Sequence, residues 1–232
     1  MRTIVEIGPG KGSLTEELLA VAGRVVAIEI DPVLVHYLQQ KFAEPIAAGK
    51  LIVIEGDVLS TDWRALPLGA DNGRPIIAGN LPYYITSPIL EKVFALGGAW
   101  ERAVFLVQEE VAARIAAEPG TRDYGYLSVM AQVQTRVEHL FRVSRDAFRP
   151  PPKVDSAVIR LTPRTPVTGD LTGFLRFAQL CFRQKRKTLR NNLAPAYGKE
   201  VVDQLPEARM RAEQLSVAEL VALYEKLSRH AA

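Results

Sequence analysis

The sequence predicts an α/β fold in which a mostly parallel, Rossmann-like sheet is followed by a small helical domain. Short runs of β-branched residues alternate with helix-patterned segments between residues 2 and 110, as in repeated βα units. A turn rich in glycine, from Gly8 to Gly12, follows the first run, and the pattern is helical from Leu171 onward. Ligands of such sheets bind where the strands end, so we expect the functional residues at the carboxyl ends of the strands.

Six runs of residues have the length and composition of strands. They are rich in Val and Ile and are bounded by Gly, Pro, Asp or Asn. These runs lie at residues 3–7, 24–30, 51–55, 75–78, 103–107 and 154–161. The first five are spaced by roughly 20 to 30 residues, which leaves room for a crossover helix between parallel strands.

Local signals mark where helices begin and where the chain cannot be regular. Ser13 with Glu16 predicts a capping box, and Pro32 directly after Asp31 predicts the first turn of another helix. The prolines at 150–152 fix φ and lack donors, so they predict a stiff surface loop. One face of the helix after Leu171 is predicted to carry Phe174, Phe177, Ala178 and Cys181.

The Pro-, Gly- and Thr-rich stretch 162–170 reads as a linker between two domains, residues 1–163 and 170–232. Charge is distributed unevenly along the chain. Residues 1–165 hold 18 Lys and Arg against 19 Asp and Glu, whereas residues 166–232 hold 11 against 7. The basic part is therefore the second domain.

The composition excludes several classes of protein. No apolar run approaches the ~18 residues of a membrane helix, and acidic residues near the start argue against a signal peptide, so we expect a cytoplasmic protein without membrane contact. Cys181 is the only cysteine. The histidines, His36, His139 and His230, lack the spacing of metal ligands, and we predict no metal site.

The turn EIGPGKGS, residues 6–13, matches neither common phosphate-binding loop. Walker A requires a glycine where Val5 stands, and G-x-G-x-x-G requires a glycine where Ser13 stands. Pro9 removes one backbone N–H, and Glu6 brings a negative charge close to the turn, so the turn suits pyrophosphate poorly. We therefore expect a ligand that carries no phosphate.

Three acids follow three successive strands: Glu6, Glu29 and Asp57. A carboxylate at Glu29 is placed to accept hydrogen bonds from ribose hydroxyls, and Asp57 is within reach of an adenine amino group. Each acid alone could merely cap a loop or pair with a cation, but together they favour a cationic cofactor with a ribose and an adenine. S-adenosyl-L-methionine fits this description. Its candidate contacts are Glu6, Gly8, Gly10, Glu29, Asp57, Val58 and Asn80.

The stretch GNLPYYIT, residues 79–86, follows the fourth strand. Asn80 offers a side-chain carbonyl, and the peptide carbonyls after it offer a second acceptor whose position Pro82 restricts. Two acceptors can hold the two hydrogens of an aromatic amine, and Tyr83 offers a flat face for an unstacked base. The alternative is a tight turn with two tyrosines at the rim of the core. Beside a methyl-donor pocket, we favour catalysis.

The motifs EIGPG, AIEID, EGD, GNLPYYI, QEEVAARI, YGYLSVMAQ, FRPPPKVDSAVIRL and FRQKRKTLRNNL occur in this order. Over essentially its full length the sequence resembles the KsgA-type ribosomal RNA small-subunit adenine dimethyltransferase family. The resemblance implies a class I methyltransferase sheet with one antiparallel strand. It also implies dimethylation of two adjacent adenines in the 3′-terminal hairpin loop of small-subunit (16S) rRNA by a monomer acting on the pre-30S subunit during ribosome assembly.

The resemblance also assigns roles to individual residues. It implies that Asn80, Leu81, Pro82 and Tyr83 form the motif that holds the target amine, and that Phe148 is a second aromatic near the base. Members of the family carry a few tens of residues before the first strand, with a Gln-Asn-Phe-Leu motif over the cofactor. Here that strand directly follows Met1, so either the start is truncated or the pocket lacks one wall.

The segment 183–192 is basic and contains no acid. We expect a phosphate-binding surface here, with Phe182, Leu189 and Leu193 facing inward from the same helix, although a solvated charged face is the simpler reading. The candidate RNA contacts are Arg183, Lys185, Arg186, Lys187 and Arg190.

Two other functions remain open from the sequence. One is a methyltransferase of the macrolide-resistance type that modifies large-subunit rRNA, although FRPPPKVDS fits the first reading better. The other is a ribosome-assembly factor that binds RNA with weak catalysis.

Overall fold

The computed structural model describes residues 2–68 and 73–229. The chain divides into two compact units: unit 1 comprises the residues up to Ala112 and Glu138–Pro163, and unit 2 comprises Ala113–Val137 and the residues from Arg164 onward. The predicted boundary had assigned all of residues 1–163 to the sheet domain. The segment Ala113–Val137 groups with the C-terminal helices because its apolar side chains join their core.

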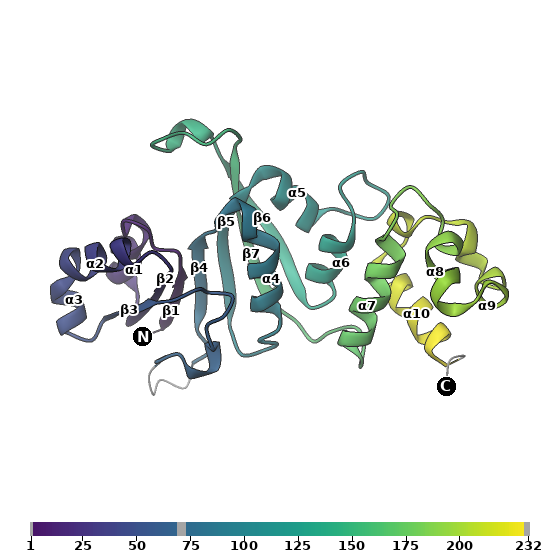
Figure 1. Ribbon diagram of the computed structural model, residues 1–232, viewed down its shortest axis with the longest axis horizontal. Coiled ribbons are helices and arrows are strands. Elements are labelled where there is room, and N and C mark those ends of the chain that lie inside the picture. The colour runs from purple at the N-terminus through teal and green to yellow at the C-terminus, as the bar shows by residue number, and fades with distance from the viewer. Residues whose placement is uncertain (1, 69–72, 230–232) are drawn as a thin grey trace. The chain divides into compact units, whose positions relative to one another are not determined.

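Within the described residues, a seven-stranded sheet has the order β3-β2-β1-β4-β5-β7-β6 (Figure 1). The strands are β1 Thr3–Ile7, β2 Arg24–Glu29, β3 Leu51–Glu55, β4 Ile76–Asn80, β5 Arg102–Gln108, β6 Thr135–Val143 and β7 Ser156–Pro163. Strands β1 to β5 pair in parallel, and β7 pairs with β5 in the antiparallel direction. The predicted mostly parallel sheet with one antiparallel strand is confirmed.

Helices connect the parallel strands, as the βα pattern predicts. They are α1 Ser13–Val21, α2 Pro32–Lys41, α3 Ala43–Ala47 and α4 Thr86–Phe94, and α5 Glu109–Ala116 follows the last parallel strand, β5. The predicted start of α2 is confirmed, because the Asp31 carboxylate accepts a hydrogen bond from the N–H of Val33 at 2.8 Å. The predicted capping box of Ser13 and Glu16 is wrong. Gly12 is the N-cap residue of α1, in a left-handed conformation that makes no side-chain cap.

The alternation of burial along β5 shows how the two faces of the sheet differ. Ala103, Phe105 and Val107 are fully buried, whereas the intervening Val104 and Leu106 are half-buried. Because successive side chains of a strand point to opposite faces, one face is completely covered and the other remains accessible at this strand. The accessible face is the one on which the site described below is built.

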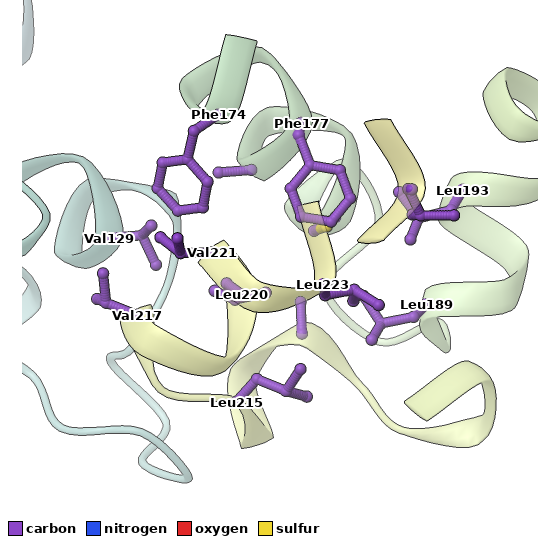
Figure 2. Packing of buried hydrophobic residues seen from close by; sticks show 14 of the residues in the cluster. Val129, Phe174, Phe177, Leu189, Leu193, Leu215, Val217, Leu220, Val221 and Leu223 are labelled. Carbon is purple, nitrogen blue, oxygen red and sulfur yellow. The ribbon is translucent and has the colours of Figure 1, made fainter. Parts of the chain in front are cut away.

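Unit 2 is a helical unit with its own hydrophobic core (Figure 2). Its helices are α6 Tyr126–Gln132, α7 Leu171–Phe182, α8 Leu189–Tyr197, α9 Lys199–Asp203 and α10 Val217–Ser228. The apolar face predicted for α7 is confirmed, since all four of its predicted residues are buried. Figure 2 shows Phe174 and Phe177 of α7 over Leu220 and Leu223 of α10.

The basic segment does not lie within one helix, and this prediction is wrong. Helix α7 ends at Phe182 and α8 begins at Leu189, so residues 183–188 form the turn between them. The buried Asn192 explains the break. Its side-chain amide donates to the carbonyl of Cys181 at 2.8 Å and to that of Gln184 at 3.2 Å, which satisfies carbonyls that a helix end leaves free.

Candidate active site

The glycine turn after β1 is a left-handed turn that depends on glycine. Gly8, Gly10 and Gly12 have φ values of 63°, 58° and 77°. A β-carbon at Gly12 would lie 2.4 Å from the ring of Phe42, so a side chain there would displace α2 from the turn. The turn therefore presents bare backbone on the accessible face of the sheet.

The carboxylate of Glu29 organises this turn. One oxygen accepts a hydrogen bond from the N–H of Gly10 at 3.0 Å, and the other accepts from the N–H groups of Ile30 and Asp31 at 3.0 and 3.1 Å. A carboxylate can accept about four hydrogen bonds, so about one position remains for a ligand hydroxyl. Glu29 therefore shapes the turn and retains some capacity to bind a ribose.

Glu6 is a buried carboxylate with an unsatisfied atom. Its side chain is 1% exposed, and its Oε2 has no hydrogen-bond partner among the described residues. The pKa of Glu6 is raised to about 7, chiefly by burial; the Thr15 side chain opposes the rise, and the negative charge of Glu29 adds to it. A buried acceptor of this kind is suited to a cationic ligand.

Asp57 and Val58 follow β3. One carboxylate oxygen of Asp57 accepts a hydrogen bond from the N–H of Leu59 at 2.9 Å, and the Val58 carbonyl accepts one from the indole of Trp63 at 3.1 Å. These bonds fix the loop after β3. The second carboxylate oxygen of Asp57 has no recorded partner among the described residues and is available to a ligand.

The end of β4 carries the motif that follows the fourth strand. Gly79 lets β4 approach β1, because a β-carbon there would lie 2.7 Å from the carbonyl oxygen of Ile7. Asn80 is exposed at the end of the strand, and the N–H of Leu81 donates to the Leu106 carbonyl at 3.0 Å. The carbonyl of Pro82 is occupied, since it accepts from the Thr86 hydroxyl at 3.1 Å. The Leu81 carbonyl is thus the better candidate for a second acceptor beside Asn80.

Tyr83 is oriented by a contact across the sheet. Its hydroxyl lies 2.7 Å from the hydroxyl of Ser156, a fully buried residue at the start of β7. The ring is therefore fixed at its far end and half-buried. Its neighbour Tyr84 is 85% exposed and lacks any such anchor among the described residues.

A cavity of about 780 Å³ brings the turn and the end of β4 together. Of the predicted residues, Glu6, Gly8, Gly10, Asn80 and Phe148 line it. Its remaining wall is largely apolar and includes the accessible face of β5. The other predicted residues lie outside this lining: Glu29, Asp57, Val58, Leu81, Pro82 and Tyr83. Of these, Glu29 contacts the lining through its hydrogen bond from the N–H of Gly10.

Several lining residues were not predicted from the sequence. Lys11 and Leu14 line the cavity from the turn and α1, and Val158 lines it from β7. The alternation of strand residues could have indicated Val158, but only the pairing of β5 with β7 places it opposite Leu106.

The predicted RNA contacts in unit 2 differ in their surroundings. Lys185 donates a hydrogen bond to the carbonyl of Arg122, and Arg190 forms a two-point ion pair with Asp203. The other predicted contacts are exposed and have no acidic partner among the described residues. They are Arg183, Arg186 and Lys187.

The described residues also bear on metal binding and on membrane insertion. Among residues 2–68 and 73–229, no group of three or more His, Cys, Asp or Glu side chains is arranged to hold a metal ion. The helices of the same residues include none with the length and apolar character needed to cross a bilayer.

Two solved structures share this architecture. A dimethyladenosine transferase from Plasmodium falciparum superposes with a TM-score of 0.78, at 24% identity over 98% of this chain and 91% of that chain. The 23S rRNA methyltransferase ErmE superposes with a TM-score of 0.69, at 28% identity over the same shares. The fold and the site define an S-adenosyl-L-methionine-dependent methyltransferase.

The sequence profile described as ribosomal RNA adenine dimethylase matches residues 1–229. "Ribosomal RNA small subunit methyltransferase A" of Chlorobium chlorochromatii is 45% identical over 95% of this chain and 81% of its own length. The protein of the same name from Acidobacterium capsulatum is 47% identical over 97% and 81%. This chain belongs to the ribosomal RNA adenine dimethylase family.

Proposed function

We propose that the protein dimethylates the exocyclic amines of two adjacent adenines in the 3′-terminal hairpin loop of small-subunit rRNA, with S-adenosyl-L-methionine as methyl donor. The observation that carries the proposal is the single cavity shared by Asn80, the glycine turn and the unpartnered carboxylate of Glu6. The names of the relatives support the choice of the small subunit. We further propose that the protein acts as a monomer in the cytoplasm on the pre-30S subunit.

The residues present fit this cofactor. The unsatisfied Oε2 of Glu6 is suited to a positive charge, and the turn from Gly8 to Gly10 leaves room for close approach. Glu29 and Asp57 each retain acceptor capacity toward hydroxyl and amino groups. When bound, S-adenosyl-L-methionine supplies an electrophilic methyl group on a sulfonium.

Asn80 and Leu81 provide the acceptors for the target amine. The Asn80 side-chain carbonyl and the Leu81 backbone carbonyl each accept one N–H, which draws the nitrogen toward a tetrahedral geometry and directs its lone pair at the methyl group. Tyr83, tethered to Ser156, and Phe148, in the cavity wall, provide aromatic faces for the extruded base. No strong base is needed, since positioning and electrostatics contribute most of the rate.

Asn80→Ala tests this assignment. The variant should lower the rate of methyl transfer by about a thousandfold, because the amine loses one of its two acceptors, while binding to the subunit changes little. The assay incubates labelled cofactor with undermethylated small subunits, and Asn191→Ala, an exposed position in unit 2, serves as the control. Unchanged turnover of Asn80→Ala would refute the role of Asn80.

The same assay separates the proposal from its alternatives. Mapping the labelled methyl groups on both rRNAs shows whether the small or the large subunit is modified. Wild-type protein that binds the subunit without transferring methyl groups would instead indicate an assembly factor.

A further inference from the structure

The connection between β6 and β7 has no role in the proposed chemistry beyond Phe148. We call residues 139–155 the β6–β7 arm. In Figure 1 the arm extends away from the rest of the sheet of unit 1. It contains the short 3-10 helix Arg145–Ala147 and the proline run that begins at Pro150.

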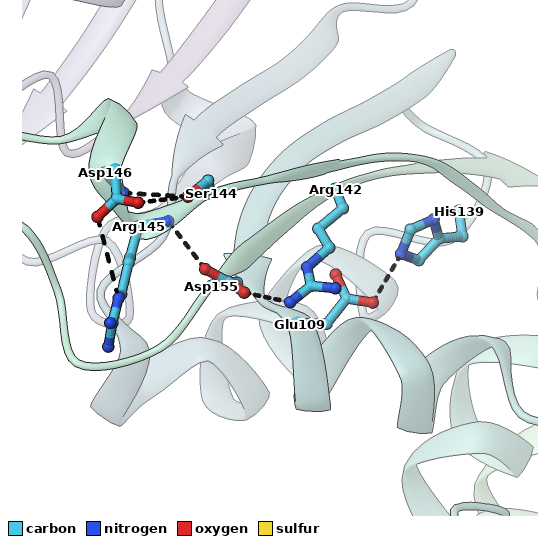
Figure 3. A network of polar contacts seen from close by, with 7 residues as sticks. All are labelled: Glu109, His139, Arg142, Ser144, Arg145, Asp146 and Asp155. Atoms are coloured by element: carbon cyan, nitrogen blue, oxygen red, sulfur yellow. Dashed lines mark hydrogen bonds and ion pairs between the residues drawn. The ribbon is translucent and has the colours of Figure 1, made fainter.

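The arm is tied firmly at its base (Figure 3). Asp155 accepts a hydrogen bond from the N–H of Arg145 at 2.9 Å and another from the guanidinium of Arg142, and its carbonyl accepts one from the N–H of Glu109 at 3.0 Å. The hydrogen bond from the Arg145 N–H, and to a smaller extent that from the Arg142 side chain, lowers the pKa of Asp155 below its ordinary value. His139 adds a contact of 3.2 Å to Glu109. The arm is therefore a fixed structural feature of unit 1.

The charge that remains on the arm is positive. It carries four cations and two carboxylates, and the pair of Arg142 and Asp155 uses one of each. Arg149 donates hydrogen bonds to the carbonyls of Asp146 and Phe148, which leave its charge uncompensated. Lys153 is exposed and has no acidic partner among the described residues. Only Arg145 lies near a remaining acid, with Nε 4.0 Å from Asp146.

The arm also exposes apolar side chains. Phe141 is 57% exposed and Val154 is 44% exposed. Phe148 instead lines the cavity that holds Asn80. A second hollow of about 640 Å³ lies at the base of the arm, where the cations Arg142, Arg145 and Lys153 share the lining with the carboxylates of Glu109, Glu110, Asp146 and Asp155. The arm is thus a wall of the active-site cavity that also carries two exposed cations without an acidic partner among the described residues, Arg149 and Lys153.

We propose that the β6–β7 arm is a second RNA-binding surface, which holds the unpaired strand on one side of the target adenine. Arg145, Arg149 and Lys153 contact its phosphates, and Phe141 stacks on a neighbouring base. The inference rests on the proposed function, because an adenine beside Asn80 requires its strand to leave the cavity past one of the walls. Exposed cations, of which Arg149 and Lys153 have no acidic partner among the described residues, and an exposed aromatic ring on the same segment fit a single-stranded nucleic acid. A protein partner would be expected to require a broader apolar patch than this arm offers.

The charge variant Arg145→Ala/Lys153→Ala tests the phosphate contacts. Its matched control is Lys50→Ala/Arg74→Ala, because both residues are exposed and precede β3 and β4, at the amino ends of strands whose carboxyl ends face the site. The probe is a synthetic stem-loop RNA with adenines in its loop, titrated by fluorescence anisotropy at several salt concentrations. The arm variant should bind about tenfold more weakly. The slope of the logarithm of its association constant against the logarithm of salt concentration, here called the salt slope, should fall in magnitude by about 1.4, at about 0.7 for each lost phosphate contact.

Phe141→Ala tests the stacking contact. It should weaken binding of the same RNA by about tenfold without changing the salt slope, and Phe141→Trp should restore binding. Photo-crosslinking from 4-thiouridine placed in the loop should label the peptide that contains residues 139–155.

These outcomes are independent of whether the proposed methylation occurs. Wild-type protein that binds the stem-loop but methylates no small subunit would refute the proposed function and leave the arm assignment standing. Wild-type affinity and salt slope in both arm variants, with no crosslink to the arm, would overturn the assignment. Weaker binding to intact subunits alone, with stem-loop binding unchanged, would also overturn it and would indicate a ribosomal protein contact. Unchanged cofactor affinity establishes that each variant is folded.

Discussion

At the scale of single residues, Glu6 has opposite effects on the stability of the ligand-free fold and on the proposed activity. Burying a carboxylate whose Oε2 has no hydrogen-bond partner among the described residues costs free energy, and the pKa raised to about 7 reflects that cost. A bound cation would compensate this charge. Glu6 is therefore unfavourable for the ligand-free fold and favourable for binding the methyl donor.

Glu6→Gln should stabilise the ligand-free protein at pH 8. The folded-state pKa lies above the unfolded value of 4.5, so the folded state binds the proton more tightly. The stability associated with this group is present below pH 4.5 and is lost as the pH rises through about 7. The advantage of the variant should therefore grow over this window, up to about 3 kcal/mol.

Urea denaturation of both proteins from pH 4.5 to 8.5 measures this difference, with Glu17→Gln, an exposed residue of α1, as the control for loss of one acid. A pH-independent difference between Glu6→Gln and wild type would contradict the environment assigned to Glu6. The same variant should bind the cationic cofactor more weakly.

At the scale of elements, the two helices around the basic turn are joined by one buried side chain. Asn192 of α8 holds the last carbonyls of α7 and so fixes residues 183–188 between them. Residues 183–188 expose their cations because Asn192, and not a continuous helix, holds their backbone.

Asn192→Ala should destabilise the protein by about 1–3 kcal/mol, because the buried carbonyl of Cys181 loses the donor that Asn192 provides, while the carbonyl of Gln184 keeps its bond from the N–H of Lys187. Thermal unfolding measures the change, and Asn191→Ala, the exposed neighbour, should have little effect. Equal melting temperatures for the two variants would show that Asn192 does not hold the turn.

At the scale of the whole molecule, the chain separates the chemistry from a basic surface. The cavity with Asn80 belongs to unit 1, and the basic turn belongs to unit 2. Substitutions in the basic turn should therefore affect RNA binding and not the cofactor site. Arg183, Arg186 and Lys187 are the useful positions, because replacing Lys185 would also remove its hydrogen bond to Arg122.

The triple variant Arg183→Ala/Arg186→Ala/Lys187→Ala should bind small subunits more weakly and with a smaller dependence on salt, while cofactor affinity stays the same. Filter binding at several salt concentrations measures the first effect and equilibrium dialysis the second. Replacing Lys199, Lys226 and Arg229 of the same unit controls for the loss of three charges. If both triple variants behave alike, the basic turn is not an RNA surface.

Much of unit 1 was predictable because its signals are local. Strand β1 and strand β3 begin and end where the apolar runs predict, and Asp31 caps α2 as expected. The errors lie where a distant group decides. Ser13 is not an N-cap because Gly12 takes a left-handed conformation packed against Phe42, and the basic turn is not helical because Asn192 holds its backbone.

The sequence by itself determined six of the seven strands of the described residues, all except β6, together with the glycine turn and the identity of the residues at the strand ends. These depend on side-chain periodicity and backbone conformation, which act over a few residues. Only the tertiary structure decided that Glu6 is buried without a partner, that Glu29 holds the turn and that Phe148 shares a cavity with Asn80. Burial and hydrogen-bond partners depend on segments far apart in the chain, and no local pattern records which segments meet.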